Sequence, residues 1–210
     1  MSHVVLLGDS IFDNAAYVRG GPAVVEQLRA KLPDGWKATL LAVDGSVTAG
    51  VRRQLDKVPR DATHLVVSVG GNDAIGHAGI LDMRAQSAAE VLARLADAGE
   101  GFRRAYREML GGVGAVGLPA GVCTVYYPNF AEPALQRIAS TALAVFNDII
   151  IVEAFAARLP LIDLRLVCSE PADYANEIEP SVKGGDKIAA AMVELVREHD
   201  FGRRRTEVFK

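Results

Sequence analysis

Five short apolar runs recur along the chain, and longer segments with helical spacing of their apolar residues separate them. Each run is nearly unbroken, which is typical of strands buried on both faces of a parallel sheet. The five predicted strands span residues 3–7, 37–43, 64–69, 121–127 and 159–164.

The segments between these runs predict helices. They run from Pro22 to just before Pro33, over 51–58, over about 83–116 with interruptions at glycines, over 133–157, and onward from a cap at Ser181. Strict alternation of strand and helix predicts an α/β fold. We expect one three-layer α/β/α sandwich with a five-stranded parallel sheet, in a single domain over residues 1–210.

Composition narrows the class of protein. Half of the 210 residues are hydrophobic, enough for one sizeable core. A net charge of -3 and a pI of about 5.8 give no electrostatic footprint for nucleic acid. Cys123 and Cys168 lack metal or redox spacing and read as small buried thiols. The first apolar run is too short for a signal sequence and no window approaches a membrane span, so we expect a cytoplasmic protein without a membrane partner.

Small and polar residues follow the first three predicted strands. The three motifs are Gly8-Asp9-Ser10, Asp44-Gly45-Ser46 and Gly70-Gly71-Asn72-Asp73. Because parallel strands share a carboxyl edge, where open α/β sheets bind ligands, these motifs should converge. A serine at that edge is a nucleophile if a base removes its proton. Each motif alone is also an ordinary turn, and the three together favour a catalytic edge.

Acyl transfer requires hydrogen-bond donors aimed at the developing oxyanion. The backbone amides of Ser10 and Gly45 and the side-chain amide of Asn72 are three such donors in this pattern. Glycine at position 45 lets the backbone approach a ligand closely. We expect Asp9 and Asp73 to lie behind these groups.

At these motifs the chain resembles the SGNH, or GDSL-type, hydrolase superfamily of esterases, lipases and acylhydrolases. The family's Gly-Asp-Ser block matches residues 8–10, the glycine of its second block matches Gly45, and its Gly-x-Asn-Asp block matches residues 70–73. The resemblance implies a flavodoxin-like strand order of 2-1-3-4-5. It also implies an ester hydrolase in which Ser10 attacks while Ser10, Gly45 and Asn72 hold the oxyanion.

The family's last block, Asp-x-x-His-Pro, is altered here. Asn176 stands at the aspartate position and Glu179 at the histidine position, followed by Pro180 and Ser181. Three interpretations of Glu179 stay open: it is the base, it accepts a hydrogen bond that locks Ser10 in a binding protein, or it is a surface residue near a helix N-terminus. A reference pKa near 4.3 suits a serine proton poorly, but burial raises the pKa of a carboxyl.

The chain has four histidines, and His77 alone follows a motif at the active edge. It is therefore the second candidate base. His3 and His64 begin strands, which places them at the opposite edge, and His199 lies at the end of the last helix.

Four carboxylates, those of Asp9, Asp13, Asp73 and Glu179, could gather at one edge and suit a hard cation. Their spacing matches no known metal loop, so we expect no metal and no cofactor. The sequence predicts a serine ester hydrolase of the SGNH type acting on a small acyl ester, with a non-standard base at Glu179 and Asn176 behind it. The alternative is a catalytically silent member that binds an acyl or carbohydrate ligand.

Overall fold

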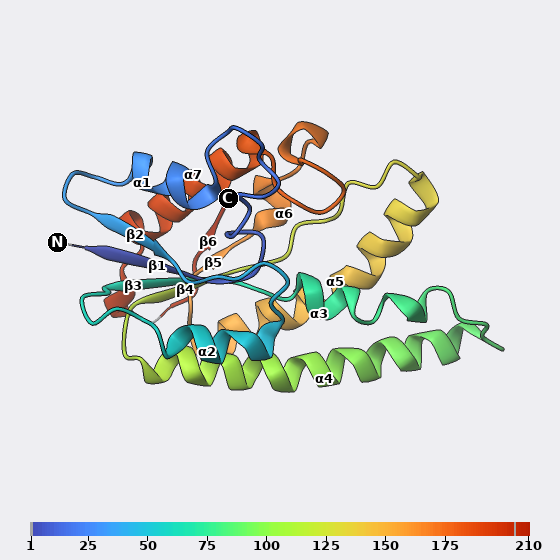
Figure 1. Ribbon diagram of the computed structural model, residues 1–210. Helices are drawn as coiled ribbons and strands as arrows, with labels where there is room; N and C mark the ends of the chain where they lie inside the picture. Colours follow the sequence, from blue (N-terminus) through green and yellow to red (C-terminus); the bar gives the residue numbers. More distant parts are fainter. Residues whose placement is uncertain (1, 204) are drawn as a thin grey trace.

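The computed structural model describes residues 2–203 and 205–210. Within these residues six strands form one parallel sheet in the order β2-β1-β3-β4-β5-β6 (Figure 1). The strands are β1 His3–Gly8, β2 Lys37–Leu40, β3 His64–Ser68, β4 Ala120–Cys123, β5 Leu161–Ile162 and β6 Val208–Phe209. The predicted parallel sheet and its order 2-1-3-4-5 are confirmed.

The sixth strand corrects the expectation of five. β6 adds a parallel edge to β5, with Leu161 opposite Val208 and Ile162 opposite Phe209. Only Phe209 of the two β6 residues is buried. A pair with one buried residue is too short to show a strand period in the sequence.

Several strands end earlier than their apolar runs. The predicted strand 121–127 ends at Cys123, because the side-chain amide of Asn147 on α5 forms hydrogen bonds with the backbone of Val125. Val125 N–H donates to Asn147 Oδ1 at 2.8 Å, and Asn147 Nδ2 donates to Val125 O at 2.8 Å. Asp163, expected inside a strand, instead caps the short helix α6 by accepting from Arg165 N–H at 3.2 Å.

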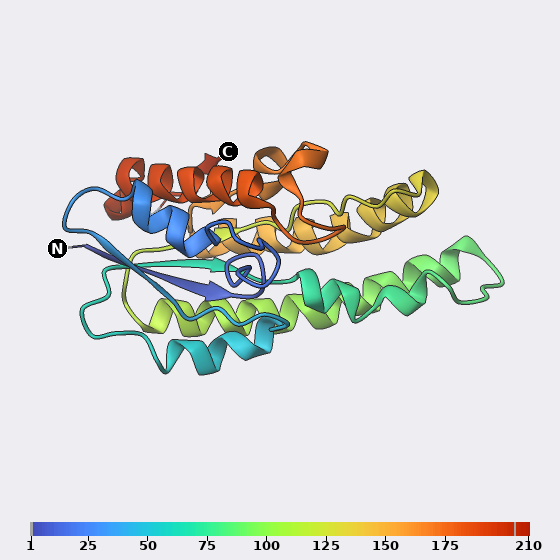
Figure 2. The same cartoon turned by 45° about the horizontal axis from the view of Figure 1, so that its top comes forward.

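Helices cover both faces of the sheet (Figure 2). On one face lie α1 (Val24–Lys31) and α7 (Val182–Glu198), packed on each other; on the other lie α2 (Val51–Leu55), α4 (Ala88–Ala115) and α5 (Pro133–Ala157). Val4 and Leu6 of β1 pack in the first layer, and Val5 and Leu7 pack in the second. The shorter elements are α3 Gly71–Ile75, α6 Leu164–Val167, η1 Thr48–Gly50, η2 Ala78–Ile80, η3 Pro171–Asp173 and η4 Phe201–Arg203.

The helix expected over about 83–116 with glycine interruptions is one continuous helix of 28 residues, α4. Ser87 caps it by accepting from Glu90 N–H at 3.2 Å. Two of its glycines mark close contacts between helices: a Cβ at Gly99 would come within 3.2 Å of Val145 on α5, and one at Gly112 within 3.2 Å of Leu55 on α2. The first turns of α4 and α5 extend past the carboxyl edge of the sheet as two arms (Figures 1 and 2).

Helix α5 corrects the expectation that no window approaches a membrane span. By length and composition it could cross a membrane, with a mean hydropathy of 1.7 over its best window. It nevertheless buries Asn147 against β4 and Glu153 against arginines of α4, with Arg107 Nη2 at 2.7 Å from Glu153 Oε1. Those contacts are typical of a core helix, which passes the same test of length and hydropathy.

Gly8 lies at a point where the backbones of β1 and β3 pass close together, and replacing it should destabilise the fold. Its φ is 130°, and a Cβ built there would lie 1.8 Å from Ser68 O. We expect Gly8→Ala to lower the free energy of unfolding by about 3 kcal/mol or more. Urea denaturation measures this change.

Gly111→Ala is the matched control, because Gly111 lies in α4 with open space around it. It should raise the free energy of unfolding by about 0.5–1 kcal/mol, since alanine restricts the unfolded chain more than glycine does. Similar stabilities for the two variants would contradict the close approach of β1 to β3.

Candidate active site

Ser10 lies in a tight turn directly after β1. Asp9 N–H donates to Ser68 O at 3.1 Å, and Asp9 O accepts from Phe12 N–H at 3.2 Å and Asp13 N–H at 3.1 Å. The turn wraps around Ser10, whose side chain is 8% exposed at the carboxyl edge of the sheet. Within the described chain no acceptor takes the Ser10 N–H, so this donor is free for a ligand.

Asn72 reaches the same place from α3, just after β3. Its Nδ2 donates to Ser46 O at 3.0 Å, which fixes the side chain and leaves its second N–H unused by that bond. Asp73 Oδ2 accepts from Thr48 N–H at 2.9 Å, so α3 is tied to the turn that carries Gly45. Gly45 itself has a φ of 75° and lies exposed on that turn.

Glu179 enters from the loop before α7, and the residue is 5% exposed. Asn176 Oδ1 accepts from Ile178 N–H at 2.9 Å and from Glu179 N–H at 2.8 Å. Ala175 N–H donates to Glu179 O at 2.8 Å and Tyr126 Oη donates to Ile178 O at 2.7 Å. Asn176 therefore holds the backbone of Glu179. The family's aspartate, by contrast, orients the side chain of the histidine.

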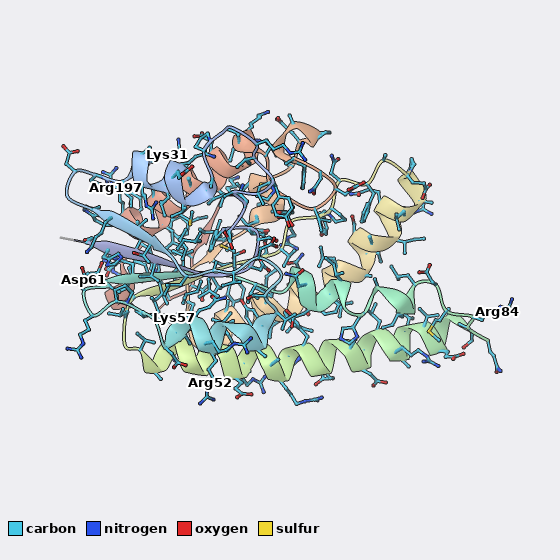
Figure 3. All side chains as sticks on the ribbon, in the orientation of Figure 1. Lys31, Arg52, Lys57, Asp61, Arg84 and Arg197 are labelled. Atoms are coloured by element: carbon cyan, nitrogen blue, oxygen red, sulfur yellow. The ribbon has the colours of Figure 1, made fainter. Side chains whose placement is uncertain are left out.

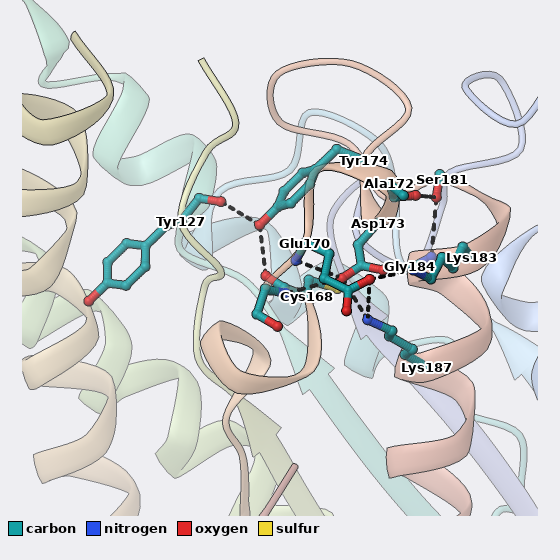
Figure 4. A network of polar contacts seen from close by, with 11 residues as sticks. Tyr127, Cys168, Glu170, Ala172, Asp173, Tyr174, Ser181, Lys183, Gly184 and Lys187 are labelled. Carbon is teal, nitrogen blue, oxygen red and sulfur yellow. Dashed lines mark hydrogen bonds and ion pairs between the residues drawn. The ribbon is translucent and has the colours of Figure 1, made fainter. Parts of the chain in front are cut away.

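An ion pair between a buried aspartate and a half-buried lysine anchors this loop to α7 (Figure 4). Asp173 is fully buried, and its Oδ2 accepts from Ser169 N–H at 3.1 Å, Glu170 N–H at 3.0 Å and Lys187 Nζ at 2.8 Å. Asp173 O accepts from Ser181 N–H, the cap of α7, at 2.9 Å. Sequence reasoning missed Asp173 and Lys187, because no spacing links a loop aspartate to a lysine on the second turn of the next helix.

Two carboxyls with raised pKa values flank Ser10. Burial raises the pKa of Glu179 to about 7; the hydroxyl of Ser10 opposes this by hydrogen bonding to the charged form, and the charge of Asp44 adds to it. Glu179 Oε2 is buried without a hydrogen-bond partner. Burial raises the pKa of Asp9 to about 8 against the hydrogen bond from Ile11 N–H, with the charges of Glu179 and Asp73 adding to it.

An apolar cavity of about 210 Å³ opens beside Ser10. Asp9, Ser10, Asn72 and Glu179 all line it, so the structure brings these four predicted residues together. Its other walls are apolar side chains of α3, α4, α5 and the segments that follow α3 and β4, among them Ile75, Leu95, Leu143 and Phe146. Gly45 and Asp73 do not line it, and no lysine or arginine does so among the described residues.

His77 also lines the cavity, but it is exposed and its ring lies 6.2 Å from that of Phe146. The other three histidines lie at the opposite edge, as expected. His3 Nδ1 pairs with Asp61 at 3.0 Å, and His199 Nδ1 pairs with Glu207 at 2.6 Å. His64 stacks on Trp36 with ring centroids 5.7 Å apart.

The carboxylates of the edge do not gather as a metal site. The described residues contain no group of three histidine, cysteine, aspartate or glutamate side chains that could hold an ion. Asp13 Oδ2 instead accepts from Asp44 N–H at 3.0 Å, and Asp13 does not line the cavity beside Ser10.

These groups can support acyl transfer. A serine hydroxyl faces a carboxyl that titrates near neutrality, free amide donors lie beside it, and an apolar cavity adjoins all of them.

Solved structures share this fold across nearly the whole chain at low identity. An extracellular lipase from Streptomyces rimosus has a TM-score of 0.66 and 18% identity, covering 95% of this chain and 100% of its own. Phospholipase A1 from Streptomyces albidoflavus has a TM-score of 0.67 and 17% identity, covering 95% and 99%. The acetyl xylan esterase AlAXEase has a TM-score of 0.69 and 16% identity, covering 92% and 99%. At these identities the likeness concerns the fold.

A search of curated proteins gives no match to this chain. A family profile does match it over residues 6–186, which include all three strand-end motifs and the Glu179 loop. The chain belongs to the GDSL-like lipase/acylhydrolase family.

Proposed function

We propose that this protein is a serine ester hydrolase in which Ser10 is the nucleophile and Glu179 is the base. The observation that carries the proposal is the buried Glu179 carboxyl, which stands at the histidine position, lines the cavity with Ser10 and has a pKa near 7. A base with a pKa near the working pH is the most effective one for proton abstraction.

The proposed reaction has two balanced halves. Ser10 Oγ attacks the ester carbonyl carbon while Glu179 takes the hydroxyl proton, and Glu179 then gives that proton to the departing alcohol. Water attacks the acyl-serine in the second half, again losing its proton to Glu179, which returns the proton to Ser10 Oγ as the acid leaves. The N–H groups of Ser10 and Asn72, which both line the cavity, stabilise the oxyanion in both halves, while Gly45, expected as a third donor, lies exposed outside the lining.

The turn at Asn176 explains how a glutamate could work without an orienting aspartate. An imidazole must be held in one tautomer and orientation by a partner on its other nitrogen. A carboxylate has no tautomer to fix. Asn176 positions it by gripping the backbone N–H groups of Ile178 and Glu179.

The cavity supports an apolar acyl group as the part of the substrate that is bound. Its walls are aliphatic and aromatic beyond the polar end, and no lysine or arginine among the described lining residues could pair with an anionic acyl group. Fold relatives named as a lipase, a phospholipase A1 and an acetyl xylan esterase fit the ester class.

One observation favours the second candidate, a silent ligand-binding protein. Glu179 Oε2 is buried without a partner, which is the situation of a carboxyl that keeps its proton. A protonated Glu179 cannot accept the proton of Ser10. The two candidates differ in whether Ser10 becomes reactive as pH rises above 7.

Ser10 labelling by an organophosphonate probe tests the proposal directly. We expect the wild type to be labelled at Ser10 at pH 8 and Ser10→Ala to show no labelling by mass spectrometry. Glu179→Gln keeps the shape of the side chain without its basicity and should slow turnover of a short aryl ester by about 10²-fold or more.

His77→Gln is the matched control, because His77 lines the same cavity and has Phe146 as its aromatic neighbour. It should change turnover by less than about threefold. Unchanged turnover in Glu179→Gln together with loss in His77→Gln would make His77 the base. A wild type that is never labelled between pH 5 and 9 would favour the silent binder.

The pH dependence should be bell-shaped, with limbs from the two carboxyls. Activity should rise as Glu179 loses its proton near pH 7 and fall as Asp9 ionises near pH 8, because a charge at Asp9 opposes the oxyanion. Asp9→Asn should keep the rising limb and lose the falling limb. A falling limb that persists in Asp9→Asn would exclude Asp9 as its source.

Glu179→His restores the family's base at the position that faces Ser10. An imidazole with a reference pKa near 6.5 suits proton abstraction at neutral pH. The double variant Asn176→Asp/Glu179→His should exceed the single variant in turnover, since an aspartate can orient the imidazole. Initial rates across pH compare them, and a double variant slower than the single one would show that residue 176 does not reach the new side chain.

A further inference from the structure

Six exposed aliphatic side chains belong to the lining of the cavity or lie one helical turn from it, and we call them the apolar rim. They are Ile75, Leu81, Leu92, Leu135, Ile138 and Ile178. Single exposed aliphatic residues are common on soluble proteins, whereas several around one opening mark an interaction site.

The apolar rim is continuous with the cavity. Ile75, Leu81, Leu135 and Ile178 each line the cavity and are also exposed at its entrance. Leu92 lies one helical turn before the lining residue Leu95 of α4, and Ile138 lies one helical turn after the lining residue Leu135 of α5. Leu92 is 65% exposed and Ile138 is 48% exposed, so neither is held by the core.

We propose that the apolar rim docks on the surface of a lipid aggregate, a micelle or a bilayer face, from which an acyl chain enters the cavity without crossing water. This goes beyond the hydrolysis of a soluble small ester. It also replaces our expectation from the sequence that the protein has no membrane partner.

The chemistry of the rim favours a lipid surface over a protein. Its members are isoleucine and leucine, while the residues that carry protein–protein binding are mostly tryptophan, tyrosine and arginine. A folded partner or a second copy seated on the rim would also close the cavity mouth. A lipid surface covers the rim and supplies the ligand through the same opening.

Charges beside the rim do not select a headgroup. Arg84 projects from the end of the segment before α4 (Figure 3), next to the exposed Asp82. Arg94 pairs with Glu90 at 3.2 Å on the same arm. Opposite charges alternate here, so apolar insertion should supply the affinity, and binding should depend little on salt.

The opposite edge of the sheet provides an internal reference. The only tryptophan of the sequence, Trp36, precedes β2 and stacks on His64 at the start of β3. It lies at the amino edge, away from the arms, and should stay in water when the rim docks. A tryptophan placed at Leu92 would enter the apolar phase.

Flotation with vesicles of phosphatidylcholine, a zwitterionic lipid, tests the proposal. The protein carries Ser10→Ala, so that vesicle binding is measured without hydrolysis. Leu92→Ser/Ile138→Ser removes two rim residues that do not line the cavity and should weaken vesicle binding by at least about tenfold. Val152→Ser/Phe155→Ser is the matched control, because these residues are similarly exposed at the far end of α5. The control should bind vesicles as the Ser10→Ala parent does.

With Ser10 intact, the rim variant Leu92→Ser/Ile138→Ser should be labelled by the organophosphonate to the same extent as the wild type. The Leu92→Trp variant should show a blue shift of its tryptophan fluorescence when vesicles are added. The fluorescence of Trp36 in the parent should not shift. Absence of vesicle binding by the parent, or equal loss in the rim and control variants, would overturn the proposal. Sedimentation velocity measures self-association. If the parent self-associates without binding vesicles, and the rim variant loses this self-association, the rim is instead a contact with a second copy of the chain.

Discussion

The burial of two carboxyls beside one hydroxyl, without a neighbouring cation, is the constraint on which the site depends. Asp9 and Glu179 are 2% and 5% exposed, and no lysine or arginine lines the cavity they share among the described residues. An unpaired buried carboxylate is costly, so both pKa values rise toward neutrality. The same shift that costs stability gives a glutamate the basicity that the family obtains from a histidine.

The rest of the loop keeps that costly arrangement in place. The ion pair of Asp173 with Lys187 fixes the loop to α7, and the side chain of Asn176 fixes the turn of Glu179. Gly184 allows the close packing, since a Cβ there would lie 2.1 Å from Asp173 O. Burial of Glu179 is therefore held by the hydrogen bonds of its loop, which separates it from a surface residue near a helix N-terminus.

The sequence predicted the sheet, because apolar runs mark buried strands. The motifs after the strands predicted that Ser10, Gly45 and Asn72 converge, and the family resemblance added Glu179; Ser10, Asn72 and Glu179 line one cavity and Gly45 does not. The sequence could not predict β6, whose two residues show no period, or the continuity of α4, in which Gly99 and Gly112 pack against neighbouring helices. Asp173 with Lys187 and the apolar rim arise from contacts between distant segments. The exposed place of Gly45, outside the cavity lining, likewise depends on how its turn bends.

The central claim is that Glu179 titrates near neutrality in the folded protein. Carboxyl ¹³C chemical shifts recorded across pH, with the Glu179→Gln variant to assign the resonance, measure this pKa directly. The account predicts a midpoint at about 7, well above the ordinary value of 4.5. A midpoint at or below that ordinary value would contradict the account, because a carboxylate of such low basicity cannot serve Ser10 as a base.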